Sequence, residues 1–348
     1  MPPPARRLTL KHRLALLSGS LLVFAGLLGL AELVCRLALD INPRGNSRNL
    51  LVKEAFGPSK GNTKNVHALS FGAEIVTDEF GFRIDPARPE PARDSAVLFL
   101  GDSVAFGPGV TERDSFVGRF RTALPAVRVY NSSVIGYSLP DYLHVAERFV
   151  PAHPEIKRVY LMYCLNDLSD QSATLIDEAL STPQTSATPA GGVDTVRRLP
   201  GITAANFFLR EHSRLYLWLS VTLTGTSQRY FEADLKLYDV DDARLAALLQ
   251  PIADIAALLA QRHVDFVVGL LPYEMQVRDK DPALRRPQQR ITEYLRAHGI
   301  ASIDLWTPVT AAKPSSTAYL FGDPMHFSTL GHQIVFDALW TDWQRRPL

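Results

Sequence analysis

After Asp94 the chain alternates short apolar runs with longer amphipathic stretches, and this pattern constrains the fold more than any other feature. Strands that alternate with helices are typical of βαβ units, in which helices cover a parallel sheet. Five runs are candidate strands, at residues 96–100, 127–131, 158–164, 264–271 and 301–305. The pattern therefore predicts an α/β domain built on a parallel sheet.

The stretches between these runs predict the helices, at residues 112–124, 140–150, 242–263 and 285–298. Pro251 is expected to kink the third of them, because proline cannot donate a backbone hydrogen bond. A last helix is expected at residues 329–343, with Ser328 as its N-cap. With 348 residues and 46% hydrophobic composition, the chain has ample material for a packed core.

Residues 168–241 interrupt this alternation between the third strand and the next helix. Within them, residues 181–192 (STPQTSATPAGG) are flexible by composition. Residues 206–223 predict one apolar helix, and the charged residues inside it argue against a second membrane span. We expect a helical insertion that caps the carboxyl ends of the strands, inside an α/β domain of residues 95–348.

An uncharged run of 18 residues, at 14–31, follows Arg6, Arg7, Lys11 and Arg13. A helix rises about 1.5 Å per residue, so this run is just long enough to cross the hydrocarbon layer of a membrane. We expect a basic cytoplasmic segment at residues 1–13 and a transmembrane anchor at residues 14–36. The α/β domain is then expected outside the inner (cytoplasmic) membrane, in the periplasm. A cleaved signal peptide and a buried core helix are the alternatives.

Residues 37–94 are rich in Asn, Pro, Gly and charged residues and show no sustained helical period. We expect a stalk or a segment that wraps around the domain. Within it, Gly81 stands between two phenylalanines, which indicates either a lip over a site or a plain turn. The plain turn, with its aromatic rings packed on the domain, is favoured.

Composition excludes several classes of function. Lys plus Arg at 37 against Asp plus Glu at 36 leaves a formal charge of +1, so no general basic field attracts nucleic acid. Cys35 and Cys164, the two cysteines, suggest neither a disulfide pair nor a metal spacing. The glycines after the first strand match neither GxGxxG nor the P-loop pattern. We therefore expect no nucleic-acid partner and no nucleotide cofactor.

Three residues with catalytic potential follow the first three strand candidates. Ser103 follows the first in GDSVAFG, Gly136 the second, and Asn166 the third in LND. The carboxyl ends of parallel strands form one edge of the sheet, where such folds place their sites. Each residue alone also fits a structural role, as a turn or a helix cap.

Asp323 and His326 lie three residues apart, in GDPMHF, just before the last helix. That spacing can bring a carboxylate to one imidazole nitrogen and leave the other nitrogen for a serine hydroxyl. His332 is expected to be structural or solvated. A metal site formed by these three residues is not expected, because no motif such as HExxH accompanies them.

Together, and in this order, four blocks resemble the SGNH, or GDSL-type, serine hydrolase family over about residues 96–348. They are Gly101-Asp102-Ser103, Gly136, Asn166-Asp167 and Asp323-Pro324-Met325-His326. The resemblance implies a three-layer α/β/α, flavodoxin-like fold with a five-stranded parallel sheet. Val104 stands where many members have Leu or Phe, and Cys164 where many have Gly.

The resemblance also implies roles for these residues. Ser103 would be the nucleophile, His326 the general base and then the acid, and Asp323 the orienting carboxylate. An oxyanion hole would use the backbone N–H groups of Ser103 and Gly136 and the side chain of Asn166. The aspartates next to Ser103 and Asn166 would brace their loops. No cofactor is implied.

The expected reaction passes through an acyl-enzyme. A serine esterase of this kind would remove acyl groups, such as acetyl, from an envelope polysaccharide, a cell-wall component or a lipid. Two alternatives stay open: an O-acyltransferase that acts on an exported polysaccharide with the same triad, and a non-catalytic carbohydrate-binding envelope protein. The anchor and the insertion also resemble a membrane-anchored bacterial subgroup of the family.

Overall fold

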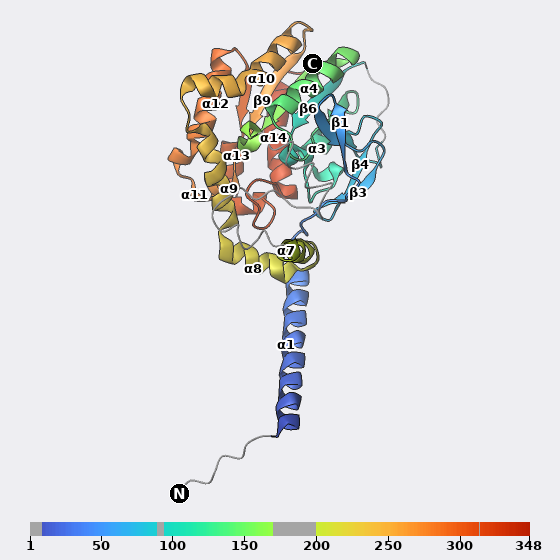
Figure 1. Cartoon of the computed structure of the whole chain (residues 1–348). Coiled ribbons are helices and arrows are strands. Elements are labelled where there is room, and N and C mark those ends of the chain that lie inside the picture. Colours follow the sequence, from blue (N-terminus) through green and yellow to red (C-terminus); the bar gives the residue numbers. More distant parts are fainter. Residues whose placement is uncertain (1–8, 89–93, 170–199, 313) are drawn as a thin grey trace.

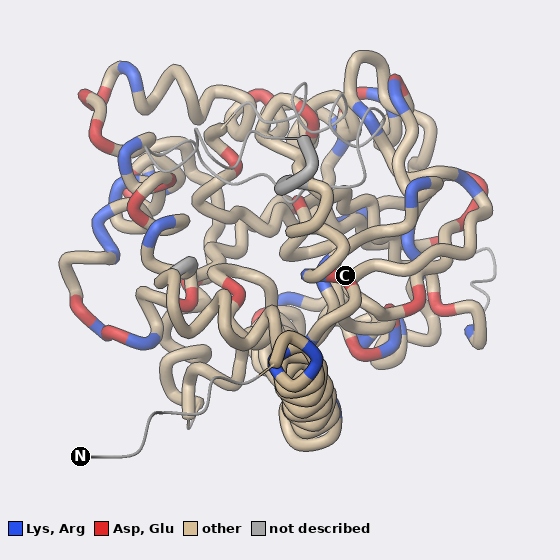
Figure 2. Tube along the Cα trace, turned by 60° about the horizontal axis from the view of Figure 1, so that its bottom comes forward, with Lys and Arg blue, Asp and Glu red and all other residues tan. Residues whose placement is uncertain are grey.

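A sheet with helices on both sides stands on the end of one long projecting helix, α1 (Leu10–Ala38) (Figure 1). The computed structural model describes residues 9–88, 94–169, 200–312 and 314–348. Residues 181–192, predicted to be flexible, lie outside the described residues. Figure 2 shows that α1 carries Lys and Arg at its amino-terminal end and is uncharged along most of its length.

The central sheet has eight strands in the order β10-β9-β8-β6-β7-β5-β4-β3. Five of them run parallel: β6 (Ala96–Gly101), β7 (Arg128–Asn131), β8 (Ile156–Tyr163), β9 (Asp265–Leu270) and β10 (Ala301–Asp304). These are the five strand candidates, each placed to within two residues. The predicted α/β fold with a parallel sheet is thereby confirmed.

The sheet does not stop at five strands. Segment 37–94 adds three antiparallel strands to the β7 edge: β3 (His67–Ser70), β4 (Ala73–Thr77) and β5 (Arg83–Ile84). A separate antiparallel pair, β1 (Leu51–Phe56) and β2 (Ser59–Asn62), comes before them. These strands have two to six residues, which is too short for most of them to show a clear alternation of polar and apolar residues.

The turn between β4 and β5 is the one that contains Gly81. Gly81 adopts a φ of +81°, and a Cβ atom there would lie 2.4 Å from the carbonyl oxygen of Asn62. Phe80 and Phe82 both pack edge-on against Phe149, with ring centroids 5.2 and 4.7 Å away. The prediction of a plain turn with aromatic rings packed on the domain is therefore confirmed.

The helices of the domain cover the two faces of the sheet (Figure 1). They are α2 (Ser103–Phe106), α3 (Phe116–Ala123), α4 (Leu139–Phe149), α10 (Asp242–Ala260), α11 (Glu274–Asp279), α12 (Arg286–Ala297), α13 (Trp306–Ala311) and α14 (Thr329–Arg345). Helix α3 packs on α14, and α4 packs on α10. Ser328 caps α14 as predicted, and its hydroxyl accepts a hydrogen bond from Gly331 N.

Within the described part of the chain, two helices, α1 and α10, are long and apolar enough to cross a membrane. Helix α10 buries Leu245, Leu249, Ile252, Ile255 and Leu259. Their spacing of three and four residues places them on one face, which is the pattern of a helix packed on a sheet. The apolar part of α1 has no buried residue, so α1 has the exposure expected of a membrane span.

The insertion contains α7 (Pro200–His212), α8 (Arg214–Thr224) and α9 (Thr226–Leu235). The prediction of a single helix at residues 206–223 is wrong, because the helix is interrupted at Ser213. The Ser213 hydroxyl accepts a hydrogen bond from Tyr216 N at 3.0 Å and so starts a new helix. Ser115 divides the predicted helix at 112–124 in the same way, with its hydroxyl accepting a bond from Gly118 N.

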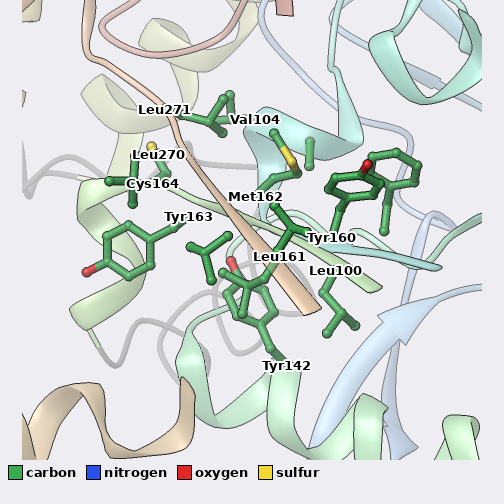
Figure 3. Close-up of a cluster of buried hydrophobic side chains, with 14 of the residues drawn as sticks. Leu100, Val104, Tyr142, Tyr160, Leu161, Met162, Tyr163, Cys164, Leu270 and Leu271 are labelled. Atoms are coloured by element: carbon green, nitrogen blue, oxygen red, sulfur yellow. The ribbon is translucent and has the colours of Figure 1, made fainter. Parts of the chain in front are cut away.

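Buried side chains fill the space beneath the carboxyl ends of the central strands (Figure 3). Leu100 comes from β6, Met162 from β8 and Leu270 from β9, and Tyr142 of α4 lies with them. Val104, directly after Ser103, joins the same cluster. The positions of the loops that follow β6 and β8 are therefore held by close packing from below.

A buried group of charges attaches the antiparallel strands to the loop after α2. Arg83 Nε lies 3.3 Å from one carboxylate oxygen of Glu112, and Arg121 Nη1 lies 2.6 Å from the other. Arg83 also donates hydrogen bonds to the carbonyl oxygens of Gly107 and Val110. Because all three charged side chains are buried, each depends on the others for its electrostatic balance.

We expect Glu112→Gln to lower the free energy of unfolding by about 3–5 kcal/mol, because two buried guanidinium groups lose their counter-ion. Urea denaturation of the detergent-solubilised chain measures this. Asp239→Asn is the matched control, since its pair with Arg286 is exposed on both sides and is worth about 1 kcal/mol or less. Equal losses in the two variants would contradict the role of the buried group.

Candidate active site

Ser103 is the first residue of α2, a single helical turn that begins where β6 ends. The Asp102 carboxylate caps this turn and accepts a hydrogen bond from Val104 N at 2.8 Å. Gly101 is the last residue of β6 and lies where a side chain has no room, because a Cβ atom there would lie 2.4 Å from the Cβ of Ala105. The Gly-Asp-Ser sequence thus makes a sharp turn from strand to helix and places Ser103 at the carboxyl edge of the sheet.

The loop before α14 brings His326 to Ser103. His326 Nε2 lies 2.9 Å from Ser103 Oγ, and His326 Nδ1 lies 2.9 Å from Asp323 Oδ1. The same carboxylate oxygen accepts hydrogen bonds from the backbone N–H groups of Met325 and His326. One imidazole nitrogen therefore faces a carboxylate while the other faces a hydroxyl, an arrangement in which a histidine can take the hydroxyl proton.

Asp323 also forms an ion pair from outside the loop. Arg44 Nη1 lies 2.8 Å from Asp323 Oδ2, and both side chains are almost fully buried. Burial alone would raise the pKa of the Asp323 carboxyl. The charges of His326 and Arg44 and the hydrogen bonds from His326 outweigh burial and hold that pKa well below its ordinary value. Asp323 is therefore a carboxylate at neutral pH.

Arg44 is itself held in place. Its Nη2 donates a hydrogen bond to the carbonyl oxygen of Phe321 at 2.8 Å. Its guanidinium lies 4.9 Å above the ring of Phe71, and the Phe71 ring meets the His326 imidazole nearly at right angles, 5.6 Å away. Arg44 and Phe71 both belong to the amino-terminal segment. Arg44 contacts Asp323, and Phe71 contacts His326.

Asn166 lies in the turn after β8 and contacts the same Asp102 oxygen, Oδ2, as the Ser103 hydroxyl. Its Nδ2 donates to Asp102 Oδ2 at 2.9 Å, while the Tyr273 hydroxyl oxygen lies 3.4 Å from its Oδ1. The same Tyr273 hydroxyl lies 2.6 Å from Asp234 of α9. A primary amide has two N–H donors, so Asn166 can hold Asp102 with one and offer the other to a ligand.

Gly136 follows β7, in a loop that returns to the end of β6. Val134 N donates to the carbonyl oxygen of Gly101 at 3.2 Å, and Tyr137 N closes a turn on Val134. Gly136 is the third residue of that turn and has a φ of +72°, which only glycine adopts easily. The loop thus lies at the same sheet edge as Ser103.

Two other residues considered from the sequence, His332 and Asp167, make structural contacts. His332 is fully buried in α14, and its Nδ1 accepts a hydrogen bond from Phe116 N. Burial, with the charge of Arg83, lowers the pKa of His332 to about 3, so the ring is neutral. Asp167 Oδ2 accepts a hydrogen bond from Cys164 N at 2.9 Å and braces the turn that carries Asn166.

Among the described residues, no group of His, Cys, Asp and Glu side chains is arranged to hold a metal ion.

Three contacts of the site were not predicted from the sequence. Arg44 lies in the segment before the domain, Asp234 in the insertion and Tyr273 after β9. None has a characteristic spacing from the residue that it contacts. The only signal was their chemistry, since an arginine, an acid and a tyrosine are common partners of buried polar groups.

A cavity of about 780 Å³ adjoins the loop that carries Asp323 and His326. Its walls come from the end of α1 and the residues after it, from α8 and α9, and from the loop itself; they include Leu39, Asn42, Val221, Gln228, Tyr319, Leu320 and Ser328. Ser103 and His326 are not among the described residues that line it. The cavity therefore lies beside the serine and histidine, toward α1.

Comparisons with known proteins indicate the family of the chain. The model of the GDSL-like lipase/acylhydrolase family matches residues 99–334. A lipolytic G-D-S-L protein from Veillonella parvula shares 13% identity over 72% of this chain and 99% of its own, with a TM-score of 0.43. A catalytic mutant of an acetylxylan esterase from Geobacillus stearothermophilus shares 15% over 73% and 96%, with a TM-score of 0.39. No curated protein matches the chain in sequence.

The family match starts within β6, just before Ser103, and ends within α14, beyond His326. It covers more than half of the chain and includes all four sequence blocks. The protein therefore belongs to the GDSL-like lipase/acylhydrolase family and is an ester hydrolase.

Proposed function

We propose that Ser103 is the nucleophile of a serine esterase, with His326 as general base and Asp323 as its orienting carboxylate. The observation that carries this proposal is the pair of 2.9 Å distances that link Ser103 Oγ, the two ring nitrogens of His326 and Asp323 Oδ1. In the first step, Ser103 Oγ attacks the ester carbonyl carbon as its proton passes to His326 Nε2. The Asp323 carboxylate stabilises the imidazolium that forms.

The tetrahedral intermediate carries a negative oxygen that needs donors. We assign these to the backbone N–H groups of Ser103 and Gly136 and to the free N–H of the Asn166 amide. His326 then returns its proton to the leaving alcohol, and the acyl group stays on Ser103. A water molecule, activated by His326, attacks this acyl-enzyme and releases the acid.

We propose that α1 spans the inner membrane and that the catalytic domain lies outside it, in the periplasm. The exposed and uncharged length of α1 and the Lys and Arg at its amino-terminal end support this orientation. A substrate at that place is an acylated envelope polysaccharide, cell-wall component or lipid. The cavity between the end of α1 and the loop of Asp323 gives such a substrate room near the membrane surface.

Arg44 is proposed as a positioning residue for this reaction. Its ion pair with Asp323 balances the buried carboxylate. The Asp323 oxygen that faces Arg44 is not the one that faces His326, so the two partners hold the carboxylate from both sides. Arg44 thus acts on the substrate only through Asp323 and His326.

The nucleophile is tested by a serine-directed fluorophosphonate, which should label the full chain and fail to label Ser103→Ala. Ser302→Ala, which removes an exposed serine of β10, should label normally. Asn166→Ala should still label but lose turnover by on the order of a hundredfold or more, as is usual for one oxyanion donor. Folded wild-type protein that takes no label would favour a non-catalytic binding module.

Product analysis with an added glycan then identifies the acceptor of the acyl group. Release of the free acid supports the esterase. Acylated glycan as the main product would replace the proposal by an O-acyltransferase.

Arg44→Met should lower kcat by about ten- to a hundredfold with little change in KM, because the Asp–His pair loses its alignment. The pKa of Asp323 should rise once the guanidinium is gone, and protonated Asp323 cannot stabilise the imidazolium. The acidic limb of the pH–rate profile should therefore move to higher pH, and Arg44→Lys should restore part of the shift. Arg286→Met, at an exposed arginine, is the control. An unmoved acidic limb in Arg44→Met would leave Arg44 with a structural role only.

Membrane topology is tested by a reporter enzyme fused after Leu348 that is active only outside the cytoplasm. We expect an active reporter, together with full-length protein that retains residues 1–36 in the membrane fraction. An inactive reporter would contradict the periplasmic location. A shortened soluble protein would identify α1 as a cleaved signal peptide.

A further inference from the structure

Helices α7 and α8 are attached to the end of α1 where it enters the domain. The Glu32 carboxylate accepts hydrogen bonds from Ser213 Oγ, Arg214 N and Leu215 N, at 2.8 to 3.0 Å. These are the first groups of α8, so a side chain of α1 caps the amino terminus of that helix. Arg36 of α1 donates to the carbonyl oxygen at the end of α7. The position of both helices along α1 is therefore set by hydrogen bonds.

Both helices lie across the direction of α1. In Figure 1, α8 runs crosswise at the end of α1, and α7 is seen along its own axis beside it. Helices in this orientation are parallel to the surface of a bilayer that α1 crosses. Their height along α1, at the level of Glu32 and Arg36, is the end of the uncharged run, where the hydrocarbon layer gives way to headgroups.

The exposed residues of α8 form one uncharged face. Trp218, Leu219, Thr222 and Leu223 are exposed, whereas Leu217 is buried against the domain. At 100° per residue, these four positions lie within an arc of about 140° on one side of the helix. Leu223 is 78% exposed, which is a large cost in water for a leucine with no partner within the described residues.

Helix α7 repeats this pattern. Ala204, Ala205, Phe208 and Leu209 are exposed at the same spacing, and Phe208 is 60% exposed; the polar residues Glu211 and His212, in the last turn of α7, are exposed as well. The ring of His212 stacks on Phe208. Two neighbouring helices that both expose apolar residues next to the end of α1 form one surface, which we call the α7–α8 face.

We propose that the α7–α8 face lies in the interfacial layer of the membrane and seats the catalytic domain on the bilayer. The proposal rests on the proposed insertion of α1. An aromatic and leucine face on a helix that lies in the membrane plane is the usual composition of interfacial helices, and Trp prefers the headgroup level. The bilayer is favoured over a protein partner because hydrogen bonds to α1 hold this face where the span leaves the lipid.

This seat is connected to the active site. Arg44 N donates a hydrogen bond to the carbonyl oxygen of Arg210 in α7, at 3.1 Å, and the Arg44 side chain pairs with Asp323. Val221 of α8 forms part of the wall of the cavity beside the loop of Asp323. In this arrangement the membrane holds the active site at a fixed height, with the cavity beside it open to substrates close to the lipid surface.

The test reconstitutes the full chain into phosphatidylcholine vesicles whose lipids carry bromine either close to the headgroup or close to the end of the acyl chain. Bromine quenches tryptophan fluorescence on contact. Of the four tryptophans, Trp306, Trp340 and Trp343 pack on the core, so Trp218 should supply most of the quenching. We expect headgroup-proximal bromine to quench more strongly than deep bromine, and Trp218→Phe to lose most of that quenching.

A second variant keeps Trp218 and so distinguishes loss of membrane contact from loss of the fluorescent side chain. Leu219→Ser combined with Leu223→Ser should reduce the quenching of Trp218, while Leu69→Ser, at an exposed leucine of β3, should leave it unchanged. Vesicle-bound protein in which Trp218→Phe loses no quenching would overturn the proposal. Quenching that falls as the protein-to-lipid ratio rises would also overturn it, because a second copy would then cover the face.

The outcomes separate this inference from the proposed function. Ser103→Ala should quench like the wild type, so loss of esterase activity alone leaves the membrane seat in place. A chain that does not stay with the vesicles contradicts the span and the seat together.

Discussion

The buried carboxylate of Asp323 is the group on which the geometry of the active site depends. A charge inside a protein is costly unless it is paired and hydrogen-bonded. Asp323 meets this condition with two backbone N–H groups, one imidazole nitrogen and the Arg44 guanidinium. Each of these contacts restricts the carboxylate in a different direction, and its remaining freedom is small. The imidazole of His326 is oriented toward Ser103 as a result.

Two arginines from the amino-terminal segment support this edge of the sheet. Arg44 pairs with Asp323, and Arg83 pairs with Glu112 and binds carbonyl groups of the loop that follows Ser103. The segment before the family domain therefore adds three strands to the sheet and also holds both halves of the active site. The loops of Ser103 and His326 come from distant parts of the chain. Arg83 connects the Ser103 loop to β5, and Arg44 connects the His326 loop to the linker that precedes the edge strands.

The insertion has a similar double role. At one end, Asp234 of α9 holds the Tyr273 hydroxyl, which in turn contacts the Asn166 amide. At the other end, α7 and α8 are capped by α1 and expose apolar residues beside the proposed span. One stretch of chain therefore contacts the proposed oxyanion donor and the proposed membrane seat.

Local patterns in the sequence were enough to predict the parallel strands, most of the helices and the four blocks of the family. Buried strands and amphipathic helices have periods that are visible within a dozen residues, and the carboxyl ends of parallel strands share one edge. That is why Ser103, Asn166, Asp323 and His326 could be selected together before their distances were known. The serine caps that divide two predicted helices were local too, but a serine inside an apolar period does not by itself end a helix.

Only the tertiary structure decided which distant groups complete the site. Strands β3 to β5 have only two to five residues; β5 pairs with the edge of β7, β4 with β5 and β3 with β4, and no local period encodes this pairing. Arg44, Tyr273 and Asp234 have no fixed spacing from their partners, since a salt bridge or hydrogen bond between distant segments depends on the folded path of both. The sequence by itself determined the candidate reactive residues and the sheet that carries them. Folding determined the buried charges and hydrogen bonds that hold those residues in register, because such contacts form only where the chain returns on itself.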